Sequence, residues 1–308
     1  MKRVITFGEI MMRLNPEGYL RFVQAGKFEA TFAGGEANTA VSLANYGIDA
    51  AFVSKVPVHE IGQMAVNELR RYGVDTSFMV RGGERLGVYF VEKGASQRAS
   101  KVIYDRANSA IAGAAAADFD WKNIFHGADW FHFTGITPAL GGQLPAICLE
   151  ACQEARKQGV TVSCDLNFRK KLWSRERANQ VMTELMPYVD ICIPNDEDPK
   201  DVFGIAARNT DLDTGKLDHQ GYISVARQLA ERFHFQKVAI TLRGSISASD
   251  NDWAAMLYSE GRAYFSRTYR IHIVDRVGGG DSFGGGLIYS LLSGLDSQKA
   301  IDFAAAET

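Results

Sequence analysis

Short apolar runs and amphipathic segments alternate along most of the chain. Runs without polar alternation predict buried strands, and segments with a period of about 3.6 residues predict helices that often stop at a glycine. Buried strands separated by helices are typical of a mostly parallel sheet covered on both faces, so we expect an α/β fold of three α/β/α layers. The expected strands are residues 4–7, 51–56, 130–133, 160–164, 191–193, 238–242 and 271–274, and the expected helices are residues 37–46, 59–72, 144–158, 175–186, 223–233, 281–292 and 297–308.

Two stretches interrupt this alternation, residues 11–33 and residues 79–106. Both contain short polar and apolar alternations, and the second has turn signals such as Gly82-Gly83. This pattern predicts antiparallel ribbons that project from the main sheet. The ribbons are either edge hairpins without a function or a small lid over a cleft, and the pattern leaves both interpretations open.

Composition and charge narrow the class of protein. The 308 residues are 46% hydrophobic and 23% charged, which is typical of a globular protein, and we expect residues 1–308 to form one domain. The formal net charge of −2 lacks the basic excess of a nucleic-acid-binding protein. The apolar run near the N-terminus is too short for a signal peptide or a membrane span. We expect a cytoplasmic protein with neither nucleic acid nor membrane as a partner.

The cysteines and histidines do not indicate a metal or redox site. Cys148 and Cys152 have helical i,i+4 spacing and, like Cys164 and Cys192, lie in apolar surroundings. Such residues are most often buried free thiols in a reducing compartment. The six histidines show no spacing typical of metal ligands.

The segment from Asp275 to Leu287 is the most informative part of the sequence. An expected strand leads into Gly278-Gly279-Gly280, and an expected helix follows. Glycines allow backbone N–H groups to converge, and the helix adds the positive end of its dipole, so the segment is suited to phosphate. Asp281 would repel that phosphate unless it contacts the group that attacks phosphorus, where it could accept a hydroxyl proton. The alternative is that Asp281 or Ser282 only caps the helix.

This segment resembles the second signature of the ribokinase-like, or PfkB-type, carbohydrate kinases. That signature, Asp-Thr-x-Gly-Ala-Gly-Asp, carries an anion hole and a catalytic base in the family. Asp275 and Asp281 match its two ends, while Arg276 stands in place of Thr and Gly279 in place of Ala. A P-loop of the GxxxxGK[ST] type is absent from the chain.

The other family motifs follow in the expected order. Residues 33–40 resemble the first signature, and residues 165–169, 195–198 and 241–244 resemble elements of the middle of the chain. Asp198 stands where the family has Glu, and Arg243 stands where Gly is common. The resemblance therefore covers almost the whole chain and implies a ribokinase-like fold with a β lid.

The resemblance also implies a reaction, the transfer of the γ-phosphoryl group of ATP to a sugar hydroxyl with Mg²⁺. Asp281 would be the catalytic base, and the backbone of Gly278, Gly279 and Gly280 would form the anion hole. Asp198 and Glu197 would order water around Mg²⁺, and a monovalent cation near the anion hole is left open. Asn195 and Asp198 could instead cap a turn. The residues implied on the nucleotide side are Asn167, Asn195, Thr241, Arg243 and Gly244.

Two arginines suggest that the sugar is an acid. A guanidinium group suits a planar carboxylate, and Arg106 and Arg169 both occupy candidate pocket positions. Together with Tyr89, Tyr104 and the Gly34-x-Glu36-x-Asn38 spacing, they resemble the 2-keto-3-deoxygluconate kinase branch of the family. The arginines could instead form surface salt bridges, the tyrosines could pack hairpins, and Glu36 could be a helix-terminal charge. The implied substrate-binding residues are Gly34, Glu36, Asn38, Tyr89, Tyr104, Arg106 and Arg169.

The resemblance thus implies ATP-dependent phosphorylation of the terminal hydroxyl of 2-keto-3-deoxygluconate. A kinase of a neutral sugar such as fructose or ribose is the first alternative. The second is a sugar-sensing protein without catalysis, although a sensor has no need of a base at Asp281. We also expect a homo-oligomer that pairs through the lid strands, since exposed strands are natural pairing edges. The last helical pattern is cut off at Thr308, which leaves a further terminal element open.

Overall fold

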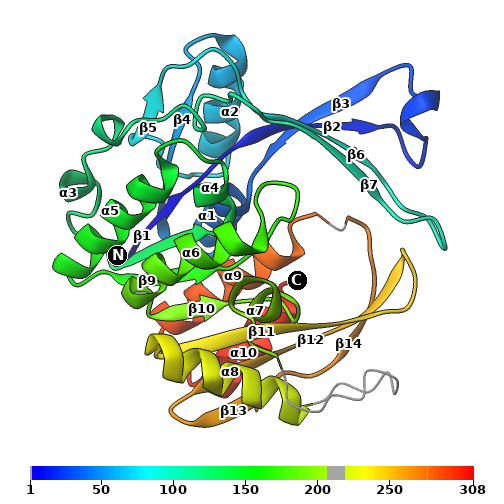
Figure 1. The fold of residues 1–308 in the computed structure, drawn as a ribbon. Coiled ribbons are helices and arrows are strands. Elements are labelled where there is room, and N and C mark those ends of the chain that lie inside the picture. The colour runs from blue at the N-terminus through cyan, green and yellow to red at the C-terminus, as the bar shows by residue number, and fades with distance from the viewer. Residues whose placement is uncertain (1, 207–218, 276) are drawn as a thin grey trace.

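The computed structural model describes residues 2–206, 219–275 and 277–308, and these form two sheets (Figure 1). The larger sheet has ten strands in the order β13-β12-β11-β10-β9-β8-β1-β4-β5, with β14 also paired to β12. All neighbours from β11 to β5 are parallel, whereas β12 pairs antiparallel with β11, β13 and β14. Its strands are β1 (Arg3–Phe7), β4 (Asp49–Val56), β5 (Met79–Arg81), β8 (Trp130–Thr134), β9 (Thr161–Asp165), β10 (Ile191–Ile193), β11 (Lys237–Ser245), β12 (Asp250–Ser259), β13 (Arg262–Phe265) and β14 (Tyr269–His272).

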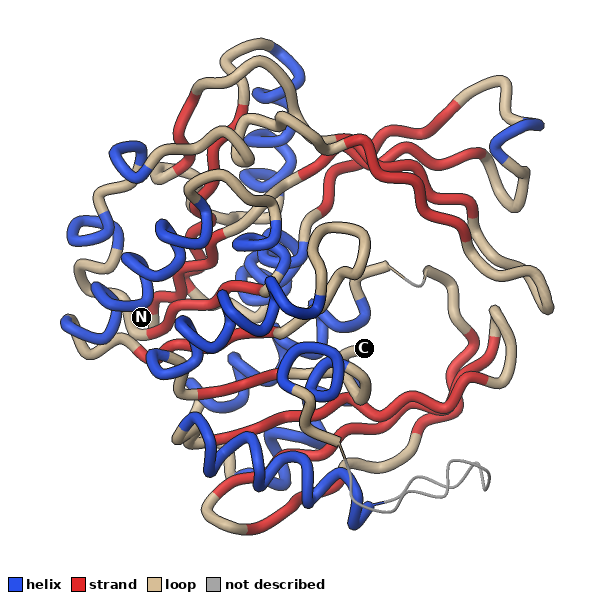
Figure 2. Tube along the Cα trace, in the orientation of Figure 1, coloured by secondary structure: helices blue, strands red, loops and turns tan. Residues whose placement is uncertain are grey.

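Helices cover both faces of this sheet, as Figure 2 shows. Core residues from α5, α6 and α8 pack on one face, and core residues from α1, α2, α9 and α10 pack on the other. The helices are α1 (Gly35–Asn45), α2 (Glu60–Arg71), α3 (Trp121–Ile124), α4 (Ile136–Ala139), α5 (Leu144–Lys157), α6 (Arg175–Leu185), α7 (Asp198–Phe203), α8 (His219–Phe233), α9 (Gly279–Leu292) and α10 (Ser297–Ala306). The expected three-layer α/β/α fold is confirmed.

Strand β1 shows why the apolar runs form this sheet. Successive side chains of a strand point to opposite faces, so Ile5 and Phe7 join one core and Val4 joins the other. All three side chains are fully buried. Burial of each contributes roughly 1.5–3 kcal/mol, so a strand without polar alternation is most stable at the centre of a covered sheet.

The antiparallel edge of the main sheet was not predicted. Strands β12 and β13 lie in a stretch where no strand was expected. Residues 271–274, expected as a strand before the glycine run, contribute only their first two residues to β14. The polar residues Asp250 and Asp252 at the start of β12 weaken its apolar signal, although the run from Trp253 to Leu257 is buried.

The smaller sheet is formed by the two polar stretches. Its order is β3-β2-β6-β7, and it projects from the main sheet. Both outer pairs are antiparallel as expected, while β2 and β6 pair in parallel at the centre. The second ribbon was expected to begin at residue 79, but residues 79–81 form β5 of the main sheet. We call this sheet the lid; its strands are β2 (Met11–Pro16), β3 (Phe28–Ala33), β6 (Val88–Glu92) and β7 (Lys101–Asp105).

Two further expectations concern thiols and membranes. Cys148, Cys152, Cys164 and Cys192 are all buried and free, which confirms the prediction of buried thiols. In the part of the chain that the structure describes, no helix has both the length and the apolar character needed to cross a bilayer.

Candidate active site

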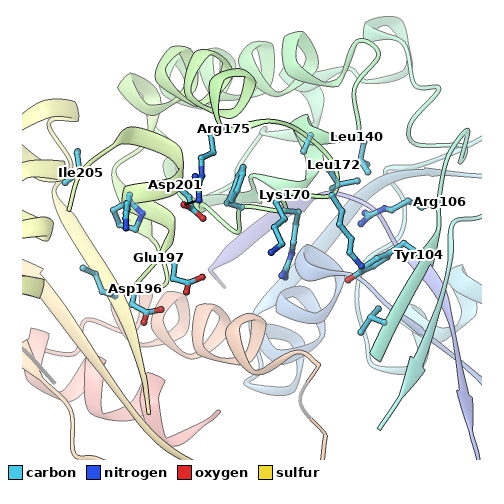
Figure 3. A pocket seen from close by; sticks show the side chains of 18 of the residues that line it. Tyr104, Arg106, Leu140, Lys170, Leu172, Arg175, Asp196, Glu197, Asp201 and Ile205 are labelled. Atoms are coloured by element: carbon cyan, nitrogen blue, oxygen red, sulfur yellow. Dashed lines mark ion pairs between the residues drawn. The ribbon is translucent and has the colours of Figure 1, made fainter. Parts of the chain in front are cut away.

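A cavity of about 1710 Å³ lies between the lid and the carboxyl ends of the parallel strands. Residues 101–108, from β7 and the turn after it, line one side, and residues 168–172, after β9, line another. Figure 3 shows Tyr104 and Arg106 of the lid on one side of this cavity, Glu197 on the other side, and Lys170 between them. Parallel strands place their functional loops at the carboxyl edge of the sheet, so this position is typical of a ligand site.

The glycine run forms the N-terminus of α9 beside this cavity. Gly278 has φ +101°, a conformation that favours glycine, and a Cβ there would lie 3.5 Å from Nδ2 of Asn38. The first intrahelical bond runs from the N–H of Ser282 to the carbonyl of Gly278 at 2.8 Å. The N–H groups of Gly279, Gly280 and Asp281 therefore have no acceptor within the helix, and a helix terminus of this kind is suited to an anion.

Asp281 is half-buried and held by a neighbouring helix. Its Oδ2 accepts a hydrogen bond of 2.6 Å from Nδ2 of Asn38 on α1. A Cβ on Gly35 would lie 3.5 Å from Oδ1, an ordinary van der Waals distance, so the second oxygen lies beside the first turn of α1. Burial raises the pKa of Asp281 above its ordinary value, while Asn38 and the charge of Arg169 act to lower it. The carboxylate is thereby a stronger base than a free aspartate.

Arg169 lines the cavity, and its charge acts on Asp281. Neither Asp281 nor the glycine run lines the cavity itself, whereas Arg169 lines it and acts on Asp281 electrostatically. The same guanidinium acts to lower the pKa of Asp165 and of Asp198, against the larger effect of their burial. Among the described residues, no carboxylate forms an ion pair with Arg169. A surface salt bridge is therefore not the role of this arginine here.

Asp165 is a carboxylate of the site that sequence reasoning did not select. It ends β9, and its Oδ1 accepts from the N–H of Asn167, which has φ +38°. Burial, then the charges of Asp198 and Asp281, raise the pKa of Asp165 well above its ordinary value. Its place in a motif next to Asn167 was a signal that could have found it.

Arg106 differs from Arg169 because it is already paired. Its Nε donates 2.8 Å to Oε2 of Glu9, its Nη2 contacts the same oxygen, and both side chains are buried. The guanidinium carbon lies 5.4 Å from the centre of the Tyr104 ring, which stacks on Tyr89 at 5.8 Å. Tyr89 is buried, while Tyr104 is 42% exposed and lines the cavity. Glu9 was missed because a lone acidic residue after a strand carries no sequence signal.

The environment of Glu36 does not fit direct contact with a substrate. Glu36 is 1% exposed, and its Oε1 accepts bonds from the N–H of Thr134 at 2.9 Å and from the hydroxyl of Thr137 at 2.6 Å. Burial raises its pKa from 4.5 to about 7. The residue connects α1 to the end of β8. Of its two motif neighbours, Asn38 contacts Asp281, and Gly34 lies where a Cβ would meet the carbonyl oxygen of Glu9.

Of the residues expected on the nucleotide side, Asn167 follows β9, and the others lie after β10 or on β11. Thr241 of β11 forms an isolated parallel bridge with Asn195, which follows β10. Gly244 also lies on β11, where a Cβ would meet that of Asp252 at 3.3 Å. Arg243 is exposed, and with the Asn251 amide oriented to accept, it donates bonds of 2.9 and 3.0 Å to that amide oxygen.

Asn195 and Asp198 show the turn cap that the sequence left open. Oδ1 of Asn195 accepts from the N–H groups of Glu197 and Asp198 at 2.8 and 2.9 Å. Asp198 is 2% exposed, and its two oxygens accept from the N–H groups of Phe168 and Asn195. Burial raises the pKa of Asp198 to about 6. This carboxylate is committed to the backbone, so it does not fit contact with a hydrated metal ion.

Glu197 and Asp196 fit a Mg²⁺ site better than Asp198. Both line the cavity, and Figure 3 shows their carboxylates on its lower side. The described residues contain no cluster of three or more metal-ligating side chains. Mg²⁺ that is carried by phosphates and water needs only one or two protein carboxylates, so this donor set is sufficient for it.

Sequence comparisons show the family of this chain. Residues 1–307 match the pfkB family of carbohydrate kinases, and the chain belongs to that family. It is similar to a 2-dehydro-3-deoxygalactonokinase of Haloferax volcanii, with 33% identity over 98% of this chain and 88% of the relative.

Solved structures of the same fold extend the comparison. A 2-dehydro-3-deoxygluconokinase structure from Thermotoga maritima is 50% identical, with a TM-score of 0.96 over 100% of this chain and 92% of that chain. A structure from E. coli, provisionally named ribokinase II and solved with ATP and Mg²⁺, is 21% identical. It has a TM-score of 0.81 over 99% of this chain and 91% of that chain, which shows the shared fold.

Proposed function

We propose that this carbohydrate kinase phosphorylates the terminal hydroxyl of 2-keto-3-deoxygluconate, also called 2-dehydro-3-deoxygluconate, with ATP. The observation that carries the proposal is Arg169, a cation of the cavity wall that no described carboxylate pairs and that acts electrostatically on Asp281. A sugar acid offers this guanidinium a carboxylate, with which it can form two parallel hydrogen bonds. The 50% identity to the Thermotoga maritima 2-dehydro-3-deoxygluconokinase supports the same substrate.

The proposed chemistry assigns one role to Asp281 and another to the start of α9. The hydroxyl oxygen of the sugar forms a bond to the γ-phosphorus, the bond from phosphorus to the leaving oxygen of ADP breaks, and the hydroxyl proton passes to Asp281. Backbone N–H groups at Gly278, Gly279 and Gly280 would stabilise charge on the transferring oxygens. Phosphoryl transfer passes through a loose transition state, so the proton leaves late and a carboxylate is a sufficient base.

ATP and Mg²⁺ would occupy the side of the cavity away from the lid. Asn167, Asn195, Thr241, Arg243 and Gly244 would line the nucleotide there, and Glu197 with Asp196 would order water around Mg²⁺. When bound, Mg²⁺ would neutralise phosphate charge. A monovalent cation near the anion hole remains a prediction, which rates measured in potassium and in tetramethylammonium salts would test.

The lid would carry Tyr104 and Arg106 to the sugar. Nε and Nη2 of Arg106 already contact Glu9, so only its other Nη would donate to the sugar. Arg169 could instead form two parallel hydrogen bonds with the sugar carboxylate. Closure of the lid over the sugar would exclude water that could otherwise accept the phosphoryl group. Tyr89 would support Tyr104 from behind, and Gly34 would allow close backbone approach.

The lid would also provide the contact between copies of the chain. Its outer end exposes Tyr19, Val23 and Phe28, of which Val23 is 93% exposed. Apolar side chains of this size on an edge sheet favour pairing with a second lid. We propose a homo-oligomer in the cytoplasm, and light scattering of the purified protein would give its mass.

A panel of acceptors tests the substrate. Coupled ADP release should be fastest with 2-keto-3-deoxygluconate and much slower with fructose or ribose. The panel includes 2-keto-3-deoxygalactonate as a second candidate, because the Haloferax volcanii relative is named for that acid. Faster release with a neutral sugar would refute the acidic substrate, and no release with any sugar would favour a sensing protein.

A further inference from the structure

One ion pair joins the lid to the loop that precedes α9. Nη2 of Arg13, on lid strand β2, lies 2.6 Å from Oδ2 of Asp275, and the Arg13 side chain is only 10% exposed. Nε of Arg13 donates a second bond, of 3.0 Å, to Oδ1 of Asn15 on the same strand. The guanidinium is therefore bonded to the lid through Nε and to the loop through Nη2.

The same carboxylate also holds the loop. Oδ1 of Asp275 accepts a bond of 3.0 Å from the N–H of Val277, the residue before the glycine run. The Val277 side chain packs against a small apolar cluster at the base of the lid, which contains Met11, Tyr89 and Val91. Polar and apolar contacts thus converge on one short segment, immediately before Gly278.

We infer that Arg13 and Asp275 are positioning residues that couple the lid to the anion hole. The two oxygens of Asp275 share one rigid plane, so the position of Arg13 determines where the N–H of Val277 points. Gly278 and the free N–H groups at the start of α9 come immediately after Val277 in the chain, so their positions depend on that of Val277. A charge-assisted bond between partly buried groups is strong enough to transmit this position. Neither residue touches the reacting atoms, and the inference rests on the proposed role of this loop in phosphoryl transfer.

The experiment compares Arg13→Met, Asp275→Asn and the double variant by steady-state kinetics. Each single variant should lower kcat by about tenfold to a hundredfold, because small misplacements of a phosphoryl-binding group are costly. KM for ATP and for the sugar should stay within about threefold, since binding contacts are intact. The double variant should be no slower than the slower single variant. Arg13→Lys, which keeps the charge, should recover most of the lost kcat.

Lys27→Met is the matched control. Lys27 forms an ion pair of 3.0 Å with Glu17 in the segment between β2 and β3, both side chains are mostly exposed, and no contact among the described residues links it to the glycine loop, so its kcat should be unchanged. Unchanged kcat in Asp275→Asn, losses that multiply in the double variant, or an increase confined to KM would each overturn the inference. Asp275 is 37% exposed, so its variant carries the test if Arg13→Met does not fold. A wild-type protein without sugar kinase activity would instead refute the proposed function.

Discussion

Nδ2 of Asn38 donates a hydrogen bond of 2.6 Å to Oδ2 of Asp281, and this bond joins the N-terminal turns of α1 and α9. The two residues are 243 positions apart in the chain. An aspartate at a helix terminus could adopt several rotamers, and the amide donor selects one of them. The other carboxylate oxygen, which lies near Gly35, is left without a side-chain donor among the described residues.

Replacement of Asn38 by alanine should therefore lower kcat without preventing folding. A hydrogen bond to a charged group contributes about 1.5–3 kcal/mol, which corresponds to roughly a tenfold to hundredfold loss of rate if the carboxylate loses its orientation. Thr39→Val is the control, because the Thr39 hydroxyl donates to the backbone carbonyls of Gly35, at 3.1 Å, and Asp281, at 3.3 Å, and not to the carboxylate of Asp281. Equal kinetics in the two variants would contradict an orienting role for Asn38.

Asp281→Asn should abolish most turnover while nucleotide binding survives. The amide keeps the size of the side chain but cannot accept the hydroxyl proton, and loss of a general base typically costs about 10²–10⁴-fold in rate. Calorimetry with ATP and Mg²⁺ should give an affinity close to that of the wild type. A kcat near the wild-type value would show that another group takes the proton.

The sequence was sufficient to predict the main sheet because its strands are buried on both faces. Strand β1 has no polar side chain at a core position except Thr6, and the run is unambiguous. Strand β12 was missed because three polar residues begin it, although the apolar run from Trp253 to Leu257 is buried like β1. A short apolar run after polar residues is easily assigned to a loop.

Site residues that belong to a local sequence motif were predictable. Contacts between residues far apart in the chain were not. The glycine run indicated the N-terminus of α9, because three adjacent glycines before a helix suit a backbone that a ligand approaches closely. The pairing of Arg106 with Glu9 spans 97 positions, so no spacing rule could reveal that its charge is compensated. The burial of Glu36 against Thr134 and Thr137 was likewise hidden, because a motif does not show which way a side chain points.

Glu36 should make the stability of the protein depend on pH. Its pKa rises from 4.5 to about 7 on folding, so the folded state holds a proton that the unfolded state releases between these values. The free energy of unfolding should therefore fall as the pH rises from 4.5 to 7, by an amount on the order of 3 kcal/mol.

Glu36→Gln isolates this effect, since glutamine keeps an oxygen that can accept the bonds from Thr134 and Thr137. Denaturant unfolding at pH 5 and pH 8 should show a smaller decline in the variant than in the wild type. At pH 8 the variant should be at least as stable, because it has no buried charge. The same pH dependence in both proteins would contradict a titrating Glu36.

Arg169→Ala should separate acidic from neutral substrates. Loss of a charge-assisted pair should lower kcat/KM for 2-keto-3-deoxygluconate by about tenfold to a hundredfold, while the value for fructose or ribose changes little. Arg169 also lowers the pKa of Asp281. Its removal should raise that pKa, so the acidic limb of the pH profile of kcat should move to higher pH for every substrate.

Arg106→Ala provides the contrast for this last prediction, because it removes a guanidinium that is already neutralised. It would leave the buried carboxylate of Glu9 without a cation, with the hydroxyl of Ser109 as its remaining side-chain donor among the described residues, and breaking such a pair typically costs about 3–5 kcal/mol of stability. Its melting temperature should therefore fall, whereas that of Arg169→Ala should not, since no described carboxylate pairs with Arg169. An equal loss of kcat/KM for acidic and neutral sugars in Arg169→Ala would show that this guanidinium does not recognise the carboxylate.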